Sequence, residues 1–225
     1  MEYHHIKTGY FLARPNRFIA QVELAGKIEL CHVKNTGRCQ ELLTPRAVVY
    51  VEENTNPKRK TKYDLIAVQK GTRLINMDSQ APNQVVHEWL LAGGLGSVTA
   101  LKPESTYGKS RLDFYLEIGQ RRIYLEVKGV TLETDGIVRF PDAPTERGLK
   151  HLHELAGCIK DGFEAYVLFV IQMQNVQYFK PNYQTHPAFG LALQEVATQG
   201  VHLLAYDCLV TPTSLVLNKP IPVRL

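Results

Sequence analysis

Long apolar runs and paired cysteines are both missing from this sequence. No apolar stretch approaches the roughly 20 residues that a membrane-spanning helix needs, and the first residues do not have the pattern of a signal peptide. The four cysteines lack the C-x-x-C spacing of zinc sites; they are Cys31, Cys39, Cys158 and Cys208. We therefore expect reduced thiols in a cytoplasmic protein, without a disulfide framework.

A strong excess of charge of one sign is also missing. Lys and Arg number 26 against 22 Asp and Glu, a net charge of +4 with a pI near 8.8. This mild basic excess permits a polyanionic partner without requiring one. The apolar content of 44% is ordinary for a soluble globular protein, and 225 residues are enough for two domains.

Residues 1–80 have the pattern of a small all-β domain. Short β-rich runs separated by turn residues predict strands at residues 10–12, 18–24, 28–33, 47–51 and 63–68. About five such strands favour a small barrel or sandwich. A loop at Asn35-Thr36-Gly37-Arg38 leads into a short helix expected at residues 39–43. Arg38 beside Gly37 is a weak signal for anion binding.

A basic loop interrupts this domain. Lys58, Arg59, Lys60 and Lys62 place four cations in the seven residues 56–62. Such a loop is suited to contacting phosphates. The equally good alternative is a solvated connection between strands.

The polar residues 78–83 predict a linker, so we expect domains at residues 1–82 and 83–225. A helix is expected over residues 84–93, with Asn83 as its N-cap. Glu88 on this helix is either a supporting acidic group for a site on the following strands or an exposed helix residue.

Strict apolar–polar alternation marks residues 110–128 as two strands joined by a turn at Gly119-Gln120. In the resulting register, paired residue numbers sum to 239, and apolar residues such as Phe114 and Leu125 face each other. The same register sets Asp113 opposite Glu126, where two like charges are destabilising.

A divalent cation between the two carboxylates would remove this repulsion. Lys128 projects to the same side as Glu126, because it lies two residues further along the strand. Asp113, Glu126 and Lys128 together suit metal-assisted hydrolysis. The alternative is a solvated hairpin face on which Lys128 screens Glu126.

A second helix is predicted from Thr145, its N-cap, to Gly162, with an apolar stripe that includes Leu152 and Ala156. Arg147, Lys150 and His151 are expected to lie away from that stripe. Cations near a helix N-terminus add to an anion site, so we interpret Arg147 and Lys150 as phosphate contacts.

The remaining chain predicts a mixed sheet. Residues 165–173 have the composition of a buried central strand, and a helix at 189–198 precedes a strand at 201–209. Strand, helix and strand in this order imply a crossover connection. A final hairpin is expected from residues 214–217 and 221–224.

Five separate motifs resemble the sugar fermentation stimulation protein A family, and the likeness covers essentially the whole chain. They are Lys34-Asn35-Thr36-Gly37-Arg38, Asn56-Pro57-Lys58-Arg59-Lys60, Arg111-Leu112-Asp113-Phe114, Glu126-Val127-Lys128-Gly129-Val130-Thr131 and Phe140-Pro141-Asp142-Ala143-Pro144-Thr145-Glu146-Arg147-Gly148. The resemblance implies an N-terminal OB-fold barrel and a C-terminal α/β domain of the PD-(D/E)xK nuclease type.

The resemblance also implies functional roles. Members of the family are described as DNA-binding and associated with sugar (maltose) utilisation. In nuclease folds of this type, magnesium or manganese would be held at Asp113, Glu126 and Val127, and Lys128 would assist. The residues leave two classes open: a metal-dependent nuclease, and a DNA-binding regulator whose site is catalytically silent. The oligomeric state is also open, with a homodimer as one option.

Overall fold

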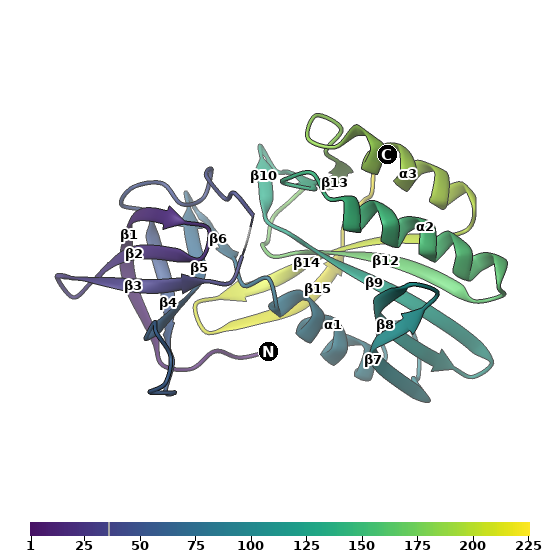
Figure 1. Ribbon diagram of the computed structural model, residues 1–225, viewed down its shortest axis with the longest axis horizontal. Helices are drawn as coiled ribbons and strands as arrows, with labels where there is room; N and C mark the ends of the chain where they lie inside the picture. The colour runs from purple at the N-terminus through teal and green to yellow at the C-terminus, as the bar shows by residue number, and fades with distance from the viewer. Residues whose placement is uncertain (36) are drawn as a thin grey trace.

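A β-barrel joined to a helix-covered sheet makes up the protein in this computed structural model, which describes residues 1–35 and 37–225 (Figure 1). Thr36, part of the predicted loop at residues 35–38, lies outside the described residues. The barrel comes first in the chain, and residues 77–80 lead from it into the second domain.

Five strands close the barrel, and a sixth extends it. They are β1 (Ile6–Asn16), β2 (Ile19–Leu24), β3 (Lys27–Val33), β4 (Val48–Glu53), β5 (Tyr63–Lys70) and β6 (Arg73–Asn76). The order is β3-β2-β1-β4-β5-β6, and parallel pairing of β3 with β5 closes the ring. The predicted OB-like barrel is confirmed. The sequence pattern does not predict β6, and the helix expected at residues 39–43 is a single turn in which the Leu43 N–H donates to the Cys39 carbonyl.

The second domain has a six-stranded mixed sheet in the order β15-β14-β12-β9-β8-β7. Its strands are β7 (Ala100–Tyr107), β8 (Ser110–Ile118), β9 (Arg121–Val130), β12 (Glu164–Ile171), β14 (His202–Thr211) and β15 (Ser214–Pro220). A smaller sheet contains β10 (Leu132–Thr134), β11 (Ile137–Phe140) and β13 (Tyr178–Pro181). The mixed α/β class is therefore confirmed.

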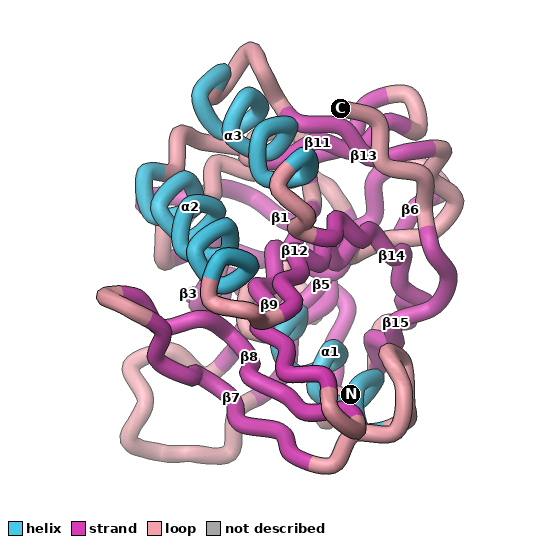
Figure 2. Tube along the Cα trace, turned by 90° about the vertical axis from the view of Figure 1, so that its right-hand side faces the viewer, coloured by secondary structure: helices cyan, strands magenta, loops and turns pink. Residues whose placement is uncertain are grey.

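Helices cover both faces of the six-stranded sheet (Figure 2). Helix α1 (Ala81–Leu91) packs on one face, against Phe114, Leu125 and Leu168. Helices α2 (Glu146–Lys160) and α3 (Pro187–Thr198) pack on the other, against side chains that include Val167 and Phe169. Strand β12 pairs in parallel with both β9 and β14, which makes it the buried central strand that the sequence predicts.

Three element boundaries that the sequence predicts in the second domain are wrong. Helix α1 begins at Ala81, so Asn83 lies inside its first turn, where Pro82 is tolerated because the first amides have no helical partner. Residues 103–107, expected in a loop, continue β7, and Pro103 is accommodated because β7 is an edge strand. The final hairpin is β14 with β15; residues 221–224 do not pair back on 214–217.

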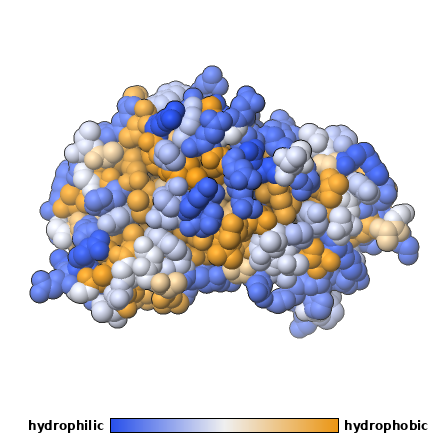
Figure 3. Space-filling model, turned by 180° about the vertical axis from the view of Figure 1, so that it is seen from behind, coloured by the Kyte–Doolittle hydropathy of each residue, from blue (hydrophilic) through white to orange (hydrophobic). Residues whose placement is uncertain are grey.

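Seen from behind, the protein shows hydrophobic residues gathered over the middle of the surface, with polar residues towards both ends (Figure 3). All four cysteines are buried and unpaired. Within the described residues, no helix has the length and apolar character needed to span a membrane.

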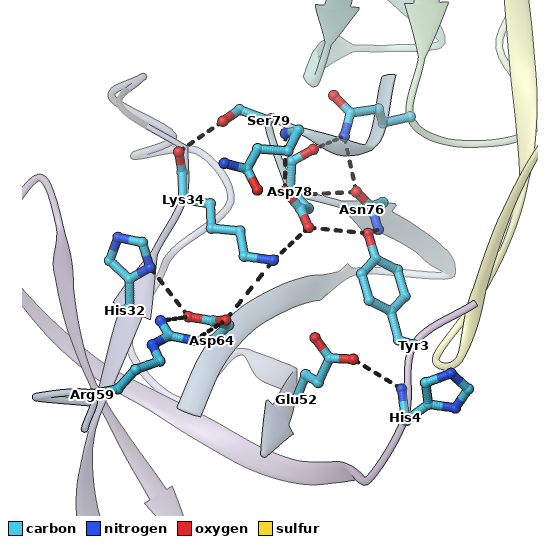
Figure 4. Close-up of polar contacts among 12 residues, drawn as sticks. Tyr3, His4, His32, Lys34, Glu52, Arg59, Asp64, Asn76, Asp78 and Ser79 are labelled. Atoms are coloured by element: carbon cyan, nitrogen blue, oxygen red, sulfur yellow. Dashed lines mark hydrogen bonds and ion pairs between the residues drawn. The ribbon is translucent and has the colours of Figure 1, made fainter. Parts of the chain in front are cut away.

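Two buried carboxylates organise polar contacts where the barrel meets the second domain (Figure 4). Asp64 on β5 accepts hydrogen bonds from the Arg59 guanidinium at 2.5 and 2.7 Å, and the His32 ring lies 3.2 Å away. Asp78 accepts from Lys34 Nζ at 2.9 Å. Although burial opposes it, the Arg59 and Lys34 charges hold the pKa of Asp64 below its usual value.

We expect Asp64→Asn to destabilise the protein by about 3 kcal/mol at pH 7, because it leaves the Arg59 charge without its partner. A carboxyl group whose pKa is lower in the folded state stabilises the fold at pH values above its pKa in the unfolded chain. This contribution disappears as the pH falls through the folded-state pKa. Urea unfolding of variant and wild type between pH 7 and pH 3 should therefore show the difference shrinking with acid. The control Glu53→Gln, at a more exposed pair with Lys7 and Lys62, should change stability much less.

Candidate metal centre

Strands β8 and β9 are paired in the predicted register only as far as Phe114 and Leu125. Beyond that pair, the Asp113 side chain inserts between the strands: its Oδ2 accepts from the Val127 amide at 2.7 Å. Its Oδ1 accepts from Asn83 Nδ2 on α1 at 2.8 Å. The predicted ladder pairs of Asp113 with Glu126 and Leu112 with Val127 are therefore absent from the register, because β8 has begun to separate from β9.

Glu126 follows Leu125 on β9, and its side chain faces α2. The residue is buried, with 2% of its surface exposed. One carboxylate oxygen, Oε1, contacts Lys128 Nζ at 2.5 Å and also contacts Nδ1 of His151. The other oxygen, Oε2, is buried and has no hydrogen-bond partner among the residues that the structure describes. An unpaired buried carboxylate oxygen is costly, so it marks a position where a cation would be stabilised.

The two carboxylates are held in different electrostatic states. Burial, and then the nearby Glu126 charge, raise the pKa of Asp113 above its ordinary value. Burial also disfavours ionised Glu126, but hydrogen bonding from His151 and the Lys128 ammonium keep its pKa below the ordinary value. Glu126 is thus ionised at neutral pH. Its negative charge disfavours the ionised form of Asp113.

His151 lies at the site, although the sequence pattern predicts it away from the buried face of α2. It is 5% exposed and directed at Glu126. Arg147, one helical turn earlier, places Nε 3.5 Å from Nε2 of the same ring. The inward position of His151 depends on a carboxylate from strand β9, which no pattern within the helix itself indicates.

These residues fit a divalent cation. Glu126 Oε2 is unpaired, Asp113 is partly buried and repelled by Glu126, and carboxylates are preferred ligands of hard cations. The Val127 amide points at Asp113, and the carbonyl of a strand residue points to the same side as its amide. In the described part of the chain no three His, Cys, Asp or Glu side chains form a ready-made metal cluster, and the donors available to a cation here would be the two carboxylates and this carbonyl.

Glu88 lies away from the candidate metal centre. Its carboxylate binds the Met1 amine at 2.7 Å, and the α1 side chain that contacts Asp113 is Asn83. The supporting role considered for Glu88 is thus not supported by its position, because the residue is on the far end of α1, where the N-terminal segment neutralises it.

Some of the residues predicted to contact nucleic acid are exposed, whereas others are engaged in contacts within the protein. Arg147 is exposed beside His151, whereas Lys150 Nζ donates to the Lys109 carbonyl at 3.1 Å. In the basic loop, Arg59 is committed to Asp64 and Lys62 to Glu53. Lys58 and Lys60 are exposed on the same loop, and Arg38 lies in the loop that Arg14 binds through backbone carbonyls. Contact with nucleic acid stays a prediction for all of these residues.

Comparisons with known proteins agree with the two-domain architecture. The family model described as "SfsA N-terminal OB domain" matches residues 12–77, and the one described as "Sugar fermentation stimulation protein RE domain" matches residues 80–214. Sugar fermentation stimulation protein homologs resemble the chain along its whole length. The homolog from Clostridium beijerinckii is 57% identical over 100% of both chains, and that from Desulfitobacterium hafniense is 56% identical over 100% of this chain and 99% of the relative.

A solved structure has the same fold. Pyrococcus furiosus SfsA, determined in complex with Ca²⁺, superposes with a TM-score of 0.89 at 27% sequence identity. The match covers 100% of this chain and 98% of that protein.

We expect Asp113→Asn to stabilise the protein by about 1 kcal/mol at pH 7 without divalent cations, because it removes a buried charge and the repulsion of that charge with Glu126. The Asp113 pKa is raised in the folded state, so the ionised group destabilises near neutrality. The gain should shrink as the pH falls and wild-type Asp113 becomes protonated. Urea unfolding measures this. A loss of stability would instead assign the carboxylate a structural role.

We expect His151→Ala to weaken Mn²⁺ binding about 10- to 100-fold, because the ring holds Glu126 in place and outer partners of this kind orient metal ligands. Isothermal titration calorimetry provides the measurement. His153→Ala is the matched control, since His153 is exposed two residues further along α2. Equal Mn²⁺ affinities for the two variants would contradict the role of His151.

Proposed function

The chain belongs to the sugar fermentation stimulation protein family, and we propose that it is a DNA-binding protein whose second domain hydrolyses phosphodiester bonds with Mg²⁺ or Mn²⁺. The observation that carries the proposal is the buried, unpaired Oε2 of Glu126 beside Asp113. A structural carboxylate would be expected to have both oxygens paired. The Pyrococcus furiosus protein was determined in complex with Ca²⁺, which supports the binding of a divalent cation by this chain.

The roles proposed for the site residues follow those in PD-(D/E)xK nucleases. Asp113, Glu126 and the Val127 carbonyl would hold the cation, which when bound would lower the pKa of a water molecule and neutralise charge on a phosphate. Lys128, whose Nζ lies 2.5 Å from Glu126 Oε1, would orient the attacking water and stabilise charge that develops on the phosphate oxygens.

The surroundings of the site favour an anionic substrate. Arg147 is exposed at the start of α2, and Thr145 caps this helix by accepting from the Gly148 amide at 3.0 Å. The helix N-terminus and the guanidinium would both attract a phosphate. OB barrels commonly bind single strands on their outer surface, so the first domain would hold the strand while the second acts on it.

We expect Lys128→Ala to abolish cleavage of DNA in Mg²⁺ or Mn²⁺, a loss of at least about 100-fold in rate, while DNA affinity changes only a few-fold. A gel assay of cleavage and fluorescence anisotropy of binding measure the two quantities separately. Lys219→Ala, at an exposed lysine on β15, is the control for the lost charge.

Unchanged cleavage in Lys128→Ala would contradict its catalytic role. DNA binding by the wild type without cleavage of any DNA or RNA substrate would favour the second class, a DNA-binding regulator with a silent site. In that case Asp113 and Glu126 would act in cation binding alone.

A further inference from the structure

The small sheet places two cations side by side. Strands β11 and β13 run parallel, and Arg139 is in register with Lys180. The preceding register pair, Val138 and Phe179, is fully buried in the core. Because side chains alternate between the faces of a strand, Arg139 and Lys180 project together from the opposite face.

Neighbouring like charges in register are destabilising unless something compensates them. Within residues 1–35 and 37–225, neither Arg139 nor Lys180 forms an ion pair with a carboxylate, and Arg139 Nη1 has only a long contact of 3.4 Å to the Ile137 carbonyl. Glu133 on the adjacent strand β10 does not serve them, because it binds Lys70 and Arg73 of the barrel at 2.9 and 2.8 Å. No carboxylate of the described residues therefore neutralises this pair of cations.

A cavity of about 420 Å³ lies at these two side chains. Asn182, Gln184 and Thr185 line it as well and offer hydrogen-bonding groups. The wall also contains Tyr183, whose hydroxyl is buried without a hydrogen-bond partner among the described residues. The cavity thus combines two cations with polar groups, the chemistry that recognises a phosphate.

This cavity adjoins the approach to the candidate metal centre. A smaller cavity of about 110 Å³ shares Arg139 and Leu132 with it and extends to Gly129, the residue after Lys128. A Cβ at Gly129 would lie 2.7 Å from Gln172 Oε1, so a glycine is needed in this wall. One acidic side chain, Asp142, also lines the smaller cavity. The lining of the smaller cavity thus runs from Arg139 of the cation pair to Gly129, and Asn35 and Ser79 complete it from the side of the barrel.

We infer that Arg139 and Lys180 form a phosphate subsite that binds a backbone phosphate of the same DNA strand, beyond the scissile bond. The inference rests on the proposed function and deepens it. The subsite would fix the strand's position and register, and it would require a substrate long enough to reach from the metal centre to β13. Single nucleotides would not gain from it.

The test compares Arg139→Gln/Lys180→Gln with wild type. The probe is a fluorescein-labelled, phosphorothioate-protected 12-nucleotide single strand, titrated by anisotropy in Mg²⁺ at several salt concentrations. We expect at least a 10-fold weaker affinity and a salt slope lower by about 0.7 for each phosphate that the variant no longer neutralises. Binding of a dinucleotide, too short to span the two sites, should be unchanged.

Lys160→Gln/Lys219→Gln is the matched control, because it removes the same charge from exposed positions on α2 and β15. Lys180→Arg keeps the charge and should bind within twofold of wild type, and the thermal midpoints should show that all variants are folded. Equally weakened binding in the two double variants, or unchanged binding in the first, would overturn the subsite and leave the proposed function intact. A wild type that binds neither DNA nor a divalent cation would overturn both.

Discussion

The buried carboxylate of Glu126 is the constraint on which the second domain depends. An ionised group with 2% exposure is tolerated only where partners compensate for lost hydration, and Lys128 and His151 compensate on one oxygen. The other oxygen remains unpaired among the described residues, and Asp113 adds a second negative charge nearby. Such an arrangement lowers the stability of the cation-free protein. A divalent cation bound between the two carboxylates would remove this cost.

The rest of the fold holds this arrangement in place. Strands β8 and β9 separate where Asp113 replaces a backbone partner, while β12 fixes β9 from the other side. The barrel is docked firmly against the same region: Lys70 and Arg73 bind the buried Glu133, and Gln172 donates to Asn76 and to the Asp78 carbonyl. These contacts therefore hold the barrel in a fixed relation to the candidate metal centre.

Local patterns in the sequence predicted much of the fold and the central residues of the site. Alternation and Gly119 gave the hairpin register as far as Phe114 with Leu125, and Thr145 and Gly162 gave the limits of α2. Long-range contacts were beyond such patterns. His151 turns inward because a carboxylate from another strand meets it, Arg59 is taken by Asp64, and Glu88 meets the N-terminus. The pairing of Arg139 with Lys180 depends on two strands that are distant in sequence.

The most direct test of the account is the anomalous difference density of crystals soaked in Mn²⁺, with data collected for wild type and Asp113→Asn. We predict one strong peak in the wild type, within bonding distance of Glu126 Oε2 and of Asp113, and the loss or marked weakening of this peak in the variant. A wild-type crystal saturated with Mn²⁺ that shows no peak at Glu126, or an equal peak there in both proteins, would contradict it.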